Sequence, residues 1–258
     1  MLFVIDVGNT NTVLGVYDRD RLLHHWRIQT HQGRTSDEHG ILLRQLFHFS
    51  GVDPSRIDDA LISCVVPPME RALEGMIEDY FELDPMMVGR DIQPQIPILY
   101  ANPREVGADR LVNAVAAYHR FETATVVVDF GTATTFDALS EEGAYLGGAI
   151  APGVTISSEA LFQHASKLPR VDIDRPSSVV GQSTVDAIRS GLLYGYTGLV
   201  REIVGRMKRQ LGSPCHVIAT GGLANLIAEE TDVIDEVDDL LTLTGLRLIY
   251  ADHRSADH

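Results

Sequence analysis

Two stretches of the chain share one pattern, and this repeat constrains the fold more than any other feature. The first covers Phe3–Asp18 and the second covers Val126–Leu139. Each is a short apolar run, then Asp-x-Gly with small polar residues, then a second apolar run, which is typical of strand–turn–strand. Asp6 and Asp129 are separated by close to half of the 258-residue chain. The repeat predicts a duplicated fold that holds one ligand between its halves.

The chemistry of the two turns favours an anionic ligand. Gly8 and Gly131 allow backbone conformations that residues with a Cβ resist, so successive N–H groups can point into one concavity. Short polar side chains add further donors at Asn9, Thr10, Thr12, Thr132, Thr134 and Thr135. Asp6 and Asp129 would repel phosphate directly, so a cation or a bound water must intervene. An ordinary hairpin with a polar turn explains either motif alone, but the duplication favours a pair of phosphate loops.

Composition narrows the classes of partner. The formal net charge is −15, which opposes a nucleic-acid backbone or an anionic membrane as the main partner. Lys167 and Lys208 are the only lysines in the sequence, and no G-x-x-x-x-G-K-[ST] motif occurs, which excludes a Walker-type nucleotide site. An anionic ligand must therefore be held by backbone dipoles, a few arginines and metal ions.

The cysteines and the hydropathy pattern indicate a compartment. Cys64 and Cys215 both lie in apolar runs, so we interpret them as buried thiols in a reducing environment rather than as a disulfide or a metal site. The first residues, MLFVIDVG, lack the basic region of a signal peptide, and no apolar run is long enough to span a bilayer. We therefore expect a cytoplasmic protein.

Apolar runs and turn residues predict two halves of similar element order. In the first half we expect strands near 2–6, 12–17, 22–29, 59–65 and 85–88, with helices near 37–50 and 68–81. In the second half we expect strands near 125–130, 134–139, 145–150 and 215–220, with helices near 184–211, 223–229 and 237–247. The fold class is α/β, with two related domains, 1–122 and 123–258, and a substrate cleft between them.

The connecting segments carry less information. A helix over Ala108–Phe121 is expected to join the two domains. The proline-punctuated segments 89–107 and 167–182 are expected to be ordered loops or lids. The acidic run Asp232–Asp239 is interpreted as a solvated surface.

A third polar segment, Tyr100–Arg110, enters the joining helix and contains the candidate base. Asp109 falls in the first helical turn, where its carboxylate could simply complement the helix dipole. Alternatively, Asp109 acts as a general base facing the cleft, with Arg110 beside it to hold an acid group. Spacing alone gives the first interpretation the edge.

Two further features are ambiguous. Gly221-Gly222 follows a predicted strand and suits close approach to a flat ligand such as adenine, although a plain turn explains it equally well. Thr184 stands at the start of the long helix, either near its cap or facing the cleft.

The long helix also carries Gly191, Gly195 and Gly198, which weaken a helix and so imply close packing against that face. Either another helix of the same chain or a second subunit could provide this contact.

Together these segments resemble one family. DVGNTNTV at 6–13, GADR at 107–110, DFGTATTFD at 129–137 and the Gly-Gly at 221–222 are similar to type III pantothenate kinases. That family belongs to the acetate/sugar kinase–Hsp70–actin superfamily. The resemblance runs essentially end to end, and it implies two ribonuclease H-like (actin-like ATPase) domains.

The resemblance also implies residue roles. Asp6, Val7, Gly8, Asn9, Thr10, Asn11, Thr12 and Val13 would bind ATP as the first phosphate motif, with Asp6 facing Mg²⁺ through a water. Thr132 would contact ATP from the second motif, and Asp129 would coordinate a potassium or ammonium ion. Asp109 would accept the proton. Pantothenate would be bound by Tyr100, Gly107, Ala108, Asp109, Arg110 and Thr184.

The implied activity is ATP-dependent phosphorylation of pantothenate to 4'-phosphopantothenate, the first step of coenzyme A biosynthesis, by a homodimer. Three alternatives are a sugar kinase of the same superfamily, a non-catalytic ATP-binding regulator, and an actin-like or Hsp70-like switch. GADR argues against the first, and the intact Asp6, Asp109 and Asp129 argue against the second. The chain is too short for the extra subdomains of the third.

Overall fold

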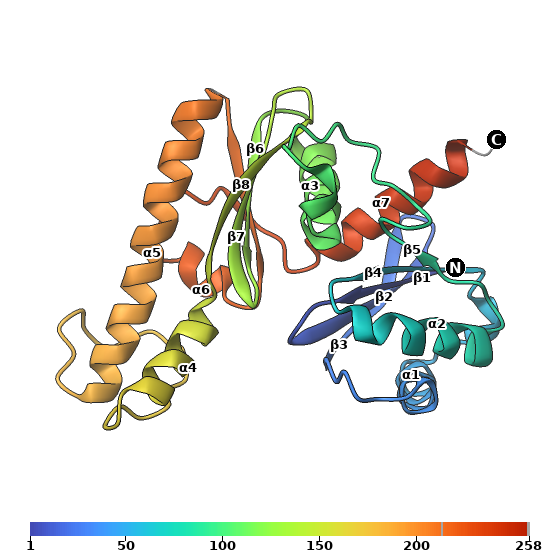
Figure 1. The fold of residues 1–258 in the computed structure, drawn as a ribbon, viewed down its shortest axis with the longest axis horizontal. Helices are drawn as coiled ribbons and strands as arrows, with labels where there is room; N and C mark the ends of the chain where they lie inside the picture. The colour runs from blue at the N-terminus through green and yellow to red at the C-terminus, as the bar shows by residue number, and fades with distance from the viewer. Residues whose placement is uncertain (213, 257–258) are drawn as a thin grey trace. The chain divides into compact units, whose positions relative to one another are not determined.

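The computed structural model describes residues 1–212 and 214–256, and these form two compact units (Figure 1). Unit 1 contains Met1–Gln95, Arg104–Ala116 and the chain from Thr242 onward. Unit 2 contains Ile96–Pro103 and Ala117–Leu241. These units differ from a division between residues 122 and 123, because the last helix clusters with unit 1. The division at 122/123 stays a prediction about the duplication itself.

Unit 1 is built on a five-stranded sheet of order β3-β2-β1-β4-β5. The strands are β1 (Leu2–Val7), β2 (Asn11–Asp18), β3 (Arg21–Gln29), β4 (Asp59–Cys64) and β5 (Met86–Met87). Strands β1, β2 and β3 pair antiparallel, whereas β4 pairs parallel with β1 and with β5. The central strand β1 is almost entirely buried, as its apolar run predicts. Asp6 lies near the carboxyl end of this central strand.

Two helices cover one face of the unit 1 sheet (Figure 1): α1 (Ser36–Ser50) and α2 (Pro67–Phe81). Thr35 and Glu38 form a capping box at the start of α1, and prolines occupy the first turn of α2. The Phe47 ring of α1 packs 5.3 Å from the Phe3 ring of β1, centroid to centroid. A short 3-10 turn, Pro54–Arg56, leads into β4.

The helix α7 (Leu241–Ala256) lies on the opposite face of this sheet (Figure 1). A Cβ on Gly15 of β2 would lie 3.0 Å from the Leu243 side chain of α7. The helix α3 (Ala108–Phe121) begins in unit 1 after a 3-10 turn, Pro103–Glu105. A Cβ on Gly245 would overlap the Val112 carbonyl oxygen, so glycine lets α7 pack directly on the backbone of α3.

Unit 2 repeats the sheet of unit 1 with the order β10-β9-β6-β7-β8. Its strands are β6 (Thr125–Phe130), β7 (Ala133–Leu139), β8 (Tyr145–Pro152), β9 (His216–Gly221) and β10 (Glu236–Val237). The β6–β7–β8 pairs are antiparallel, and the β6–β9 and β9–β10 pairs are parallel, as in unit 1. The predicted duplication of the fold is therefore confirmed.

Three helices complete unit 2: α4 (Val154–His164), α5 (Thr184–Leu211) and α6 (Ala224–Ala228). The ends of α5 are as predicted, because Ser183 caps its start by accepting the N–H of Asp186 and Gly212 ends it. Leu193, Val200 and Val204 of α5 are fully buried in a core with the central strand β6. None of the described helices is both long enough and apolar enough to cross a membrane.

Three expectations for the second half of the chain need correction. The helix expected near 237–247 forms over Leu241–Ala256, after the short strand β10. No element was expected over Val154–His164, where α4 forms, because this segment mixes β-branched residues and serines and buries little. The run 232–239 is not simply a solvated surface, since Glu236 and Val237 pair with β9. Within that run, Asp235 accepts the N–H of Val217 at 2.7 Å, which anchors the segment to the sheet.

Candidate active site

The first predicted phosphate loop connects β1 to β2 in unit 1. The N–H of Gly8 donates to the Asn11 carbonyl at 3.0 Å and closes the turn. A Cβ on Gly8 would lie only 3.0 Å from that same oxygen, so the tight turn favours glycine. Asn9, Thr10 and Asn11 are exposed at its tip, whereas Thr12 is only 2% exposed. The exposed tip can meet an anionic ligand, while Thr12 faces inward.

Thr30, which the sequence analysis did not single out, braces this loop from the end of β3. Its hydroxyl donates to the Gly8 carbonyl at 2.7 Å, and its N–H donates to the Thr10 carbonyl at 2.9 Å. The hydroxyls of Thr12 and Thr30 lie 2.9 Å apart. Thr12 is the donor in this pair, because the single hydroxyl proton of Thr30 is already donated to the Gly8 carbonyl. No local pattern marks Thr30, because its partners lie about twenty residues earlier.

Asp109 lies in the first turn of α3, also in unit 1. Its Oδ1 accepts the N–H of Arg110 at 2.8 Å, so the carboxylate does complement the helix start. A Cβ on Gly107 would lie 2.6 Å from that oxygen. This contact supports the first interpretation of Asp109, and its role as a general base stays a prediction.

Buried contacts hold α3 in place behind Asp109. Asn113, one helical turn further on, is buried, and its Oδ1 accepts the Thr242 hydroxyl of α7 at 2.7 Å. Together with the close packing of Gly245 on Val112, this contact fixes the helix that presents Asp109. GADR therefore sits on a rigid element, which suits a group that must hold a defined position.

The second phosphate loop connects β6 to β7 in unit 2 and is one residue shorter than the first. Asp6 pairs with Val13 across the first hairpin, whereas Asp129 pairs with Thr135 across the second. Gly153, at the start of α4, supports this loop by donating its N–H to the Thr132 carbonyl at 3.2 Å. A Cβ on Gly153 would overlap that carbonyl oxygen, so α4 approaches the loop backbone closely. This role of Gly153 was not expected from the sequence, although the Pro152-Gly153 pair signals a break.

Asp129 lies between two hydroxyl side chains on the neighbouring strands. Its register partners are Thr135 on β7 and Thr220 on β9, and paired residues point to the same face of a sheet. The equivalent partners of Asp6 are Val13 and Ser63. One carboxylate with neutral oxygens fits a hard monovalent cation such as potassium. Among the described residues, no group of three or more His, Cys, Asp or Glu could hold a metal ion.

The Gly221-Gly222 pair has a structural explanation for its first residue. Gly221 adopts φ +94°, and a Cβ there would lie 2.7 Å from Oδ1 of Asp129. A Cβ on Gly222 would have no described atom within 4 Å, so neither strain nor packing requires glycine there. The contact of this glycine pair with adenine stays a prediction.

The remaining predicted residues of unit 2 lie on its surface. Tyr100 is 37% exposed, on a loop beside β8, with its ring edge-on to Tyr145. Thr184 is exposed at the first residue of α5, and the cap itself is provided by Ser183. Unit 1 thus contains the Asp6–Val13 loop and Gly107–Arg110, whereas unit 2 contains Tyr100, Asp129, Thr132 and Thr184.

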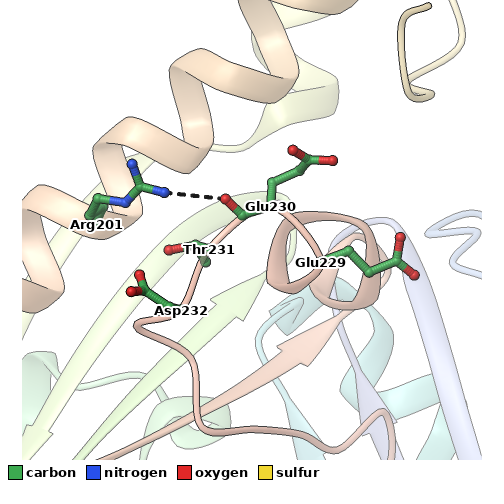
Figure 2. Close-up of a pocket in the computed structure, with 5 residues that line it drawn as sticks. All are labelled: Arg201, Glu229, Glu230, Thr231 and Asp232. Carbon is green, nitrogen blue, oxygen red and sulfur yellow. Dashed lines mark hydrogen bonds between the residues drawn. The ribbon is translucent and has the colours of Figure 1, made fainter.

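A shallow pocket of about 690 Å³ in unit 2 contains none of these residues (Figure 2). It is lined by Arg201, Glu229, Glu230, Thr231 and Asp232. The Arg201 guanidinium of α5 donates to the Glu230 carbonyl at 3.3 Å, as Figure 2 shows. The lining contains three acidic residues and one arginine, which opposes a phosphate group, so this pocket does not fit the predicted ATP site.

Both cysteines are free thiols, but they are half-buried rather than buried as expected from the sequence. Burial raises the pKa of the Cys64 thiol to about 11, and the thiol donates to the Val66 carbonyl at 3.3 Å. Cys64 pairs with Val7 beside the first phosphate loop, but a thiol with this pKa stays protonated and unreactive near neutral pH.

Solved structures with the same architecture define the class of protein. A protein from Campylobacter jejuni described as belonging to the Baf family of transcriptional activators superposes with a TM-score of 0.60 at 20% identity, covering 98% of this chain and 99% of that one. An inorganic polyphosphate/ATP-glucomannokinase from Arthrobacter superposes with a TM-score of 0.51 at 15% identity, covering 100% and 99%. The protein therefore has the actin-like fold of the sugar kinases.

Sequence comparison then gives the family. Residues 2–206 match the type III pantothenate kinase family. The chain is 58% identical to the type III pantothenate kinase of Myxococcus xanthus over 250 residues, covering 97% of this chain and 98% of that protein. It is 55% identical to that of Geobacter sulfurreducens over 254 residues, covering 98% and 100%. The chain belongs to the type III pantothenate kinase family.

Proposed function

We propose that the protein transfers the terminal phosphoryl group of MgATP to the primary hydroxyl of pantothenate, forming 4'-phosphopantothenate for coenzyme A biosynthesis. The observation that carries the proposal is the GADR segment, which sets Asp109 on a rigid helix start in a chain of this family. Phosphoryl transfer has a loose transition state, so positioning and charge neutralisation do most of the work.

Asp109 accepts the proton of the pantothenate hydroxyl as the new bond to phosphorus forms. Its Oδ1 is held by the N–H of Arg110, which orients the carboxylate at the start of α3. Arg110 provides a positive charge for the pantothenate carboxylate, and Tyr100 and Thr184 provide hydroxyl donors.

The two turns hold the phosphates. The exposed residues Asn9–Asn11 and the N–H groups around them meet the ATP phosphates, and Thr132 contacts ATP from the second loop. Asp6 orients Mg²⁺ through a water, and Asp129, with Thr135 and Thr220 beside it, holds potassium or ammonium. When bound, these cations neutralise charge on the phosphates.

A homodimer through α5 is part of this proposal. Gly191, Gly195 and Gly198 are exposed along α5, and no described residue lies within 4 Å of a Cβ built on any of them. Packing within the described chain therefore does not account for these glycines, which supports a second subunit as their partner. Light scattering should give twice the 28.3 kDa chain mass. Gly195→Leu should weaken assembly, and a monomeric wild type would contradict the interface.

A cytoplasmic location stays a prediction from the sequence.

The test of the function is an ADP-release assay across pantothenate, pantothenol, glucose and glycerol, with mass spectrometry of the product. Pantothenate should be the best acceptor and should gain one phosphoryl group. If glucose or glycerol outperforms pantothenate, the chain is a sugar kinase. If no acceptor is phosphorylated although ATP binds, the non-catalytic regulator is the better assignment.

A further inference from the structure

The loop that carries Tyr100 is fixed to unit 2 through one residue of β8. The N–H of Tyr145 donates to the Pro97 carbonyl at 2.8 Å, and the N–H of Leu99 donates to the Tyr145 carbonyl at 2.8 Å. These two bonds make Pro97–Leu99 a short extra edge beside β8. Tyr100 directly follows this edge, so the backbone of Tyr145 fixes the position of the Tyr100 backbone.

The side chain of Tyr145 then sets where the Tyr100 ring lies. The two ring centroids are 6.3 Å apart with an interplanar angle of 62°, which is a favourable edge-to-face geometry. The Tyr100 ring also lies close to Gly147, where a Cβ would be 3.1 Å from two ring carbons. Gly147 also has φ +114°, a conformation that favours glycine. The Tyr100 ring thus packs against the ring of Tyr145 and the backbone of Gly147.

A buried carboxylate, that of Asp137, holds the Tyr145 ring in this position. The Tyr145 hydroxyl donates to Oδ1 of Asp137 at 2.7 Å, and the Thr135 hydroxyl donates to Oδ2 of Asp137 at 3.2 Å. Tyr145 is 0% exposed and Asp137 is 1% exposed. Burying a carboxylate is costly unless its oxygens are hydrogen-bonded. A phenylalanine at position 145 would fill nearly the same volume without needing a buried carboxylate as its partner. The pair therefore does more than fill the core, since it fixes the angle of the Tyr145 ring.

We propose that Asp137 and Tyr145 are positioning residues, which hold the Tyr100 ring at the pantothenate site through the Tyr145 hydroxyl. The inference rests on the proposed function, in which Tyr100 binds pantothenate. The same carboxylate accepts from Thr135, the register partner of Asp129. Asp137 thereby connects the loop that carries Tyr100 to β7, the strand that follows the second predicted phosphate loop.

The test is Tyr145→Phe, which removes the hydroxyl and keeps the ring. We expect the KM for pantothenate to rise about 5- to 20-fold, because a displaced contact residue weakens acceptor binding, while the KM for ATP and kcat stay within about twofold. Asp137→Asn keeps an oxygen acceptor for Tyr145 and should have a smaller effect than Asp137→Ala. Tyr250→Phe, which removes a hydroxyl paired with Asp59 in unit 1, is the matched control and should leave the pantothenate KM unchanged.

A double-mutant cycle separates positioning from a purely structural role. In a Tyr100→Ala background, Tyr145→Phe should no longer change the pantothenate KM, because the ring that it positions is gone. An unchanged pantothenate KM in Tyr145→Phe would overturn the inference and leave the proposed function intact. An equal effect in the presence and absence of the Tyr100 ring would also overturn it. A wild type that does not phosphorylate pantothenate would instead overturn the proposed function.

Discussion

A Cβ on Gly107 would lie 2.6 Å from Oδ1 of Asp109, so the Asp109 carboxylate has room in this position because residue 107 has no side chain. The same oxygen accepts the N–H of Arg110 at 2.8 Å, which orients the carboxylate at the start of α3. The glycine of GADR therefore makes room for the proposed base, and this relationship gives the first prediction.

Gly107→Ala should lower kcat by roughly 10- to 100-fold, because the new methyl group displaces the Asp109 carboxylate from its reacting position. The KM for ATP should change little. Gly33→Ala is the matched control, because no described residue lies within 4 Å of a Cβ at that position. Steady-state kinetics on the two variants decide the matter, and a wild-type kcat for Gly107→Ala would refute the link between glycine and base.

Asp109→Asn should lower kcat by roughly 100- to 10,000-fold, which is the usual cost of losing a general base. The asparagine side-chain oxygen can still accept the N–H of Arg110, so the helix start should stay capped. Circular dichroism and the melting temperature should therefore match the wild type. Near-normal kcat with an intact fold would show that Asp109 only caps the helix.

Activity should depend on potassium or ammonium and be weak in sodium alone, because Asp129 lies between two hydroxyl side chains that suit such a cation. Thr220→Val should raise the potassium concentration for half-maximal rate about 3- to 10-fold, and Thr220→Ser should restore most of it. Potassium-dependent thermal shifts without substrates give a readout independent of activity. Thr125→Val, at the other end of β6, is the control. Equal rates in all three chloride salts would remove the cation from Asp129.

The sequence predicted the elements whose signals are local. Ser183 with Asp186 marks the start of α5, Gly212 marks its end, and both boundaries are confirmed. The repeated Asp-x-Gly turns predicted the two sheets, because each turn follows a buried central strand. By contrast, α4 has no strong periodicity, and β10 is only two residues long within an acidic run.

The candidate site could be predicted only where a family motif or turn chemistry pointed to it. Thr30 and Gly153 escaped because their importance comes from partners distant in sequence, namely Gly8 and Thr132. Gly221 was noticed as half of a pair, but the reason for that glycine is the nearby carboxylate of Asp129. Contacts between distant segments require the fold, since no local pattern encodes them.

Cys64 should react slowly with thiol reagents in the folded protein, because burial raises its pKa to about 11. At pH 8 roughly one thiol in a thousand would be ionised, and labelling should speed up about tenfold per pH unit. The measurement uses a Cys215→Ser variant, with urea-unfolded protein as the reference. Since the folded pKa lies above the ordinary value of 9.0, the contribution of Cys64 to stability is present below pH 9 and is lost between about pH 9 and 11. Fast labelling of folded protein at pH 7 would contradict this.

Arg110→Ala should lower kcat/KM for pantothenate by about 10- to 150-fold, which corresponds to losing a charge-assisted contact of roughly 1.5–3 kcal/mol. The physical reason is that Arg110 follows the proposed base directly and offers a positive charge for the acceptor carboxylate, in a chain whose net charge is −15. The KM for ATP should change little. Pantothenol, which lacks the carboxylate, serves as the control acceptor: it should be a poor substrate for the wild type and should lose less activity on the same substitution. If both acceptors respond equally to Arg110→Ala, Arg110 does not pair with the carboxylate and acts on the site in another way.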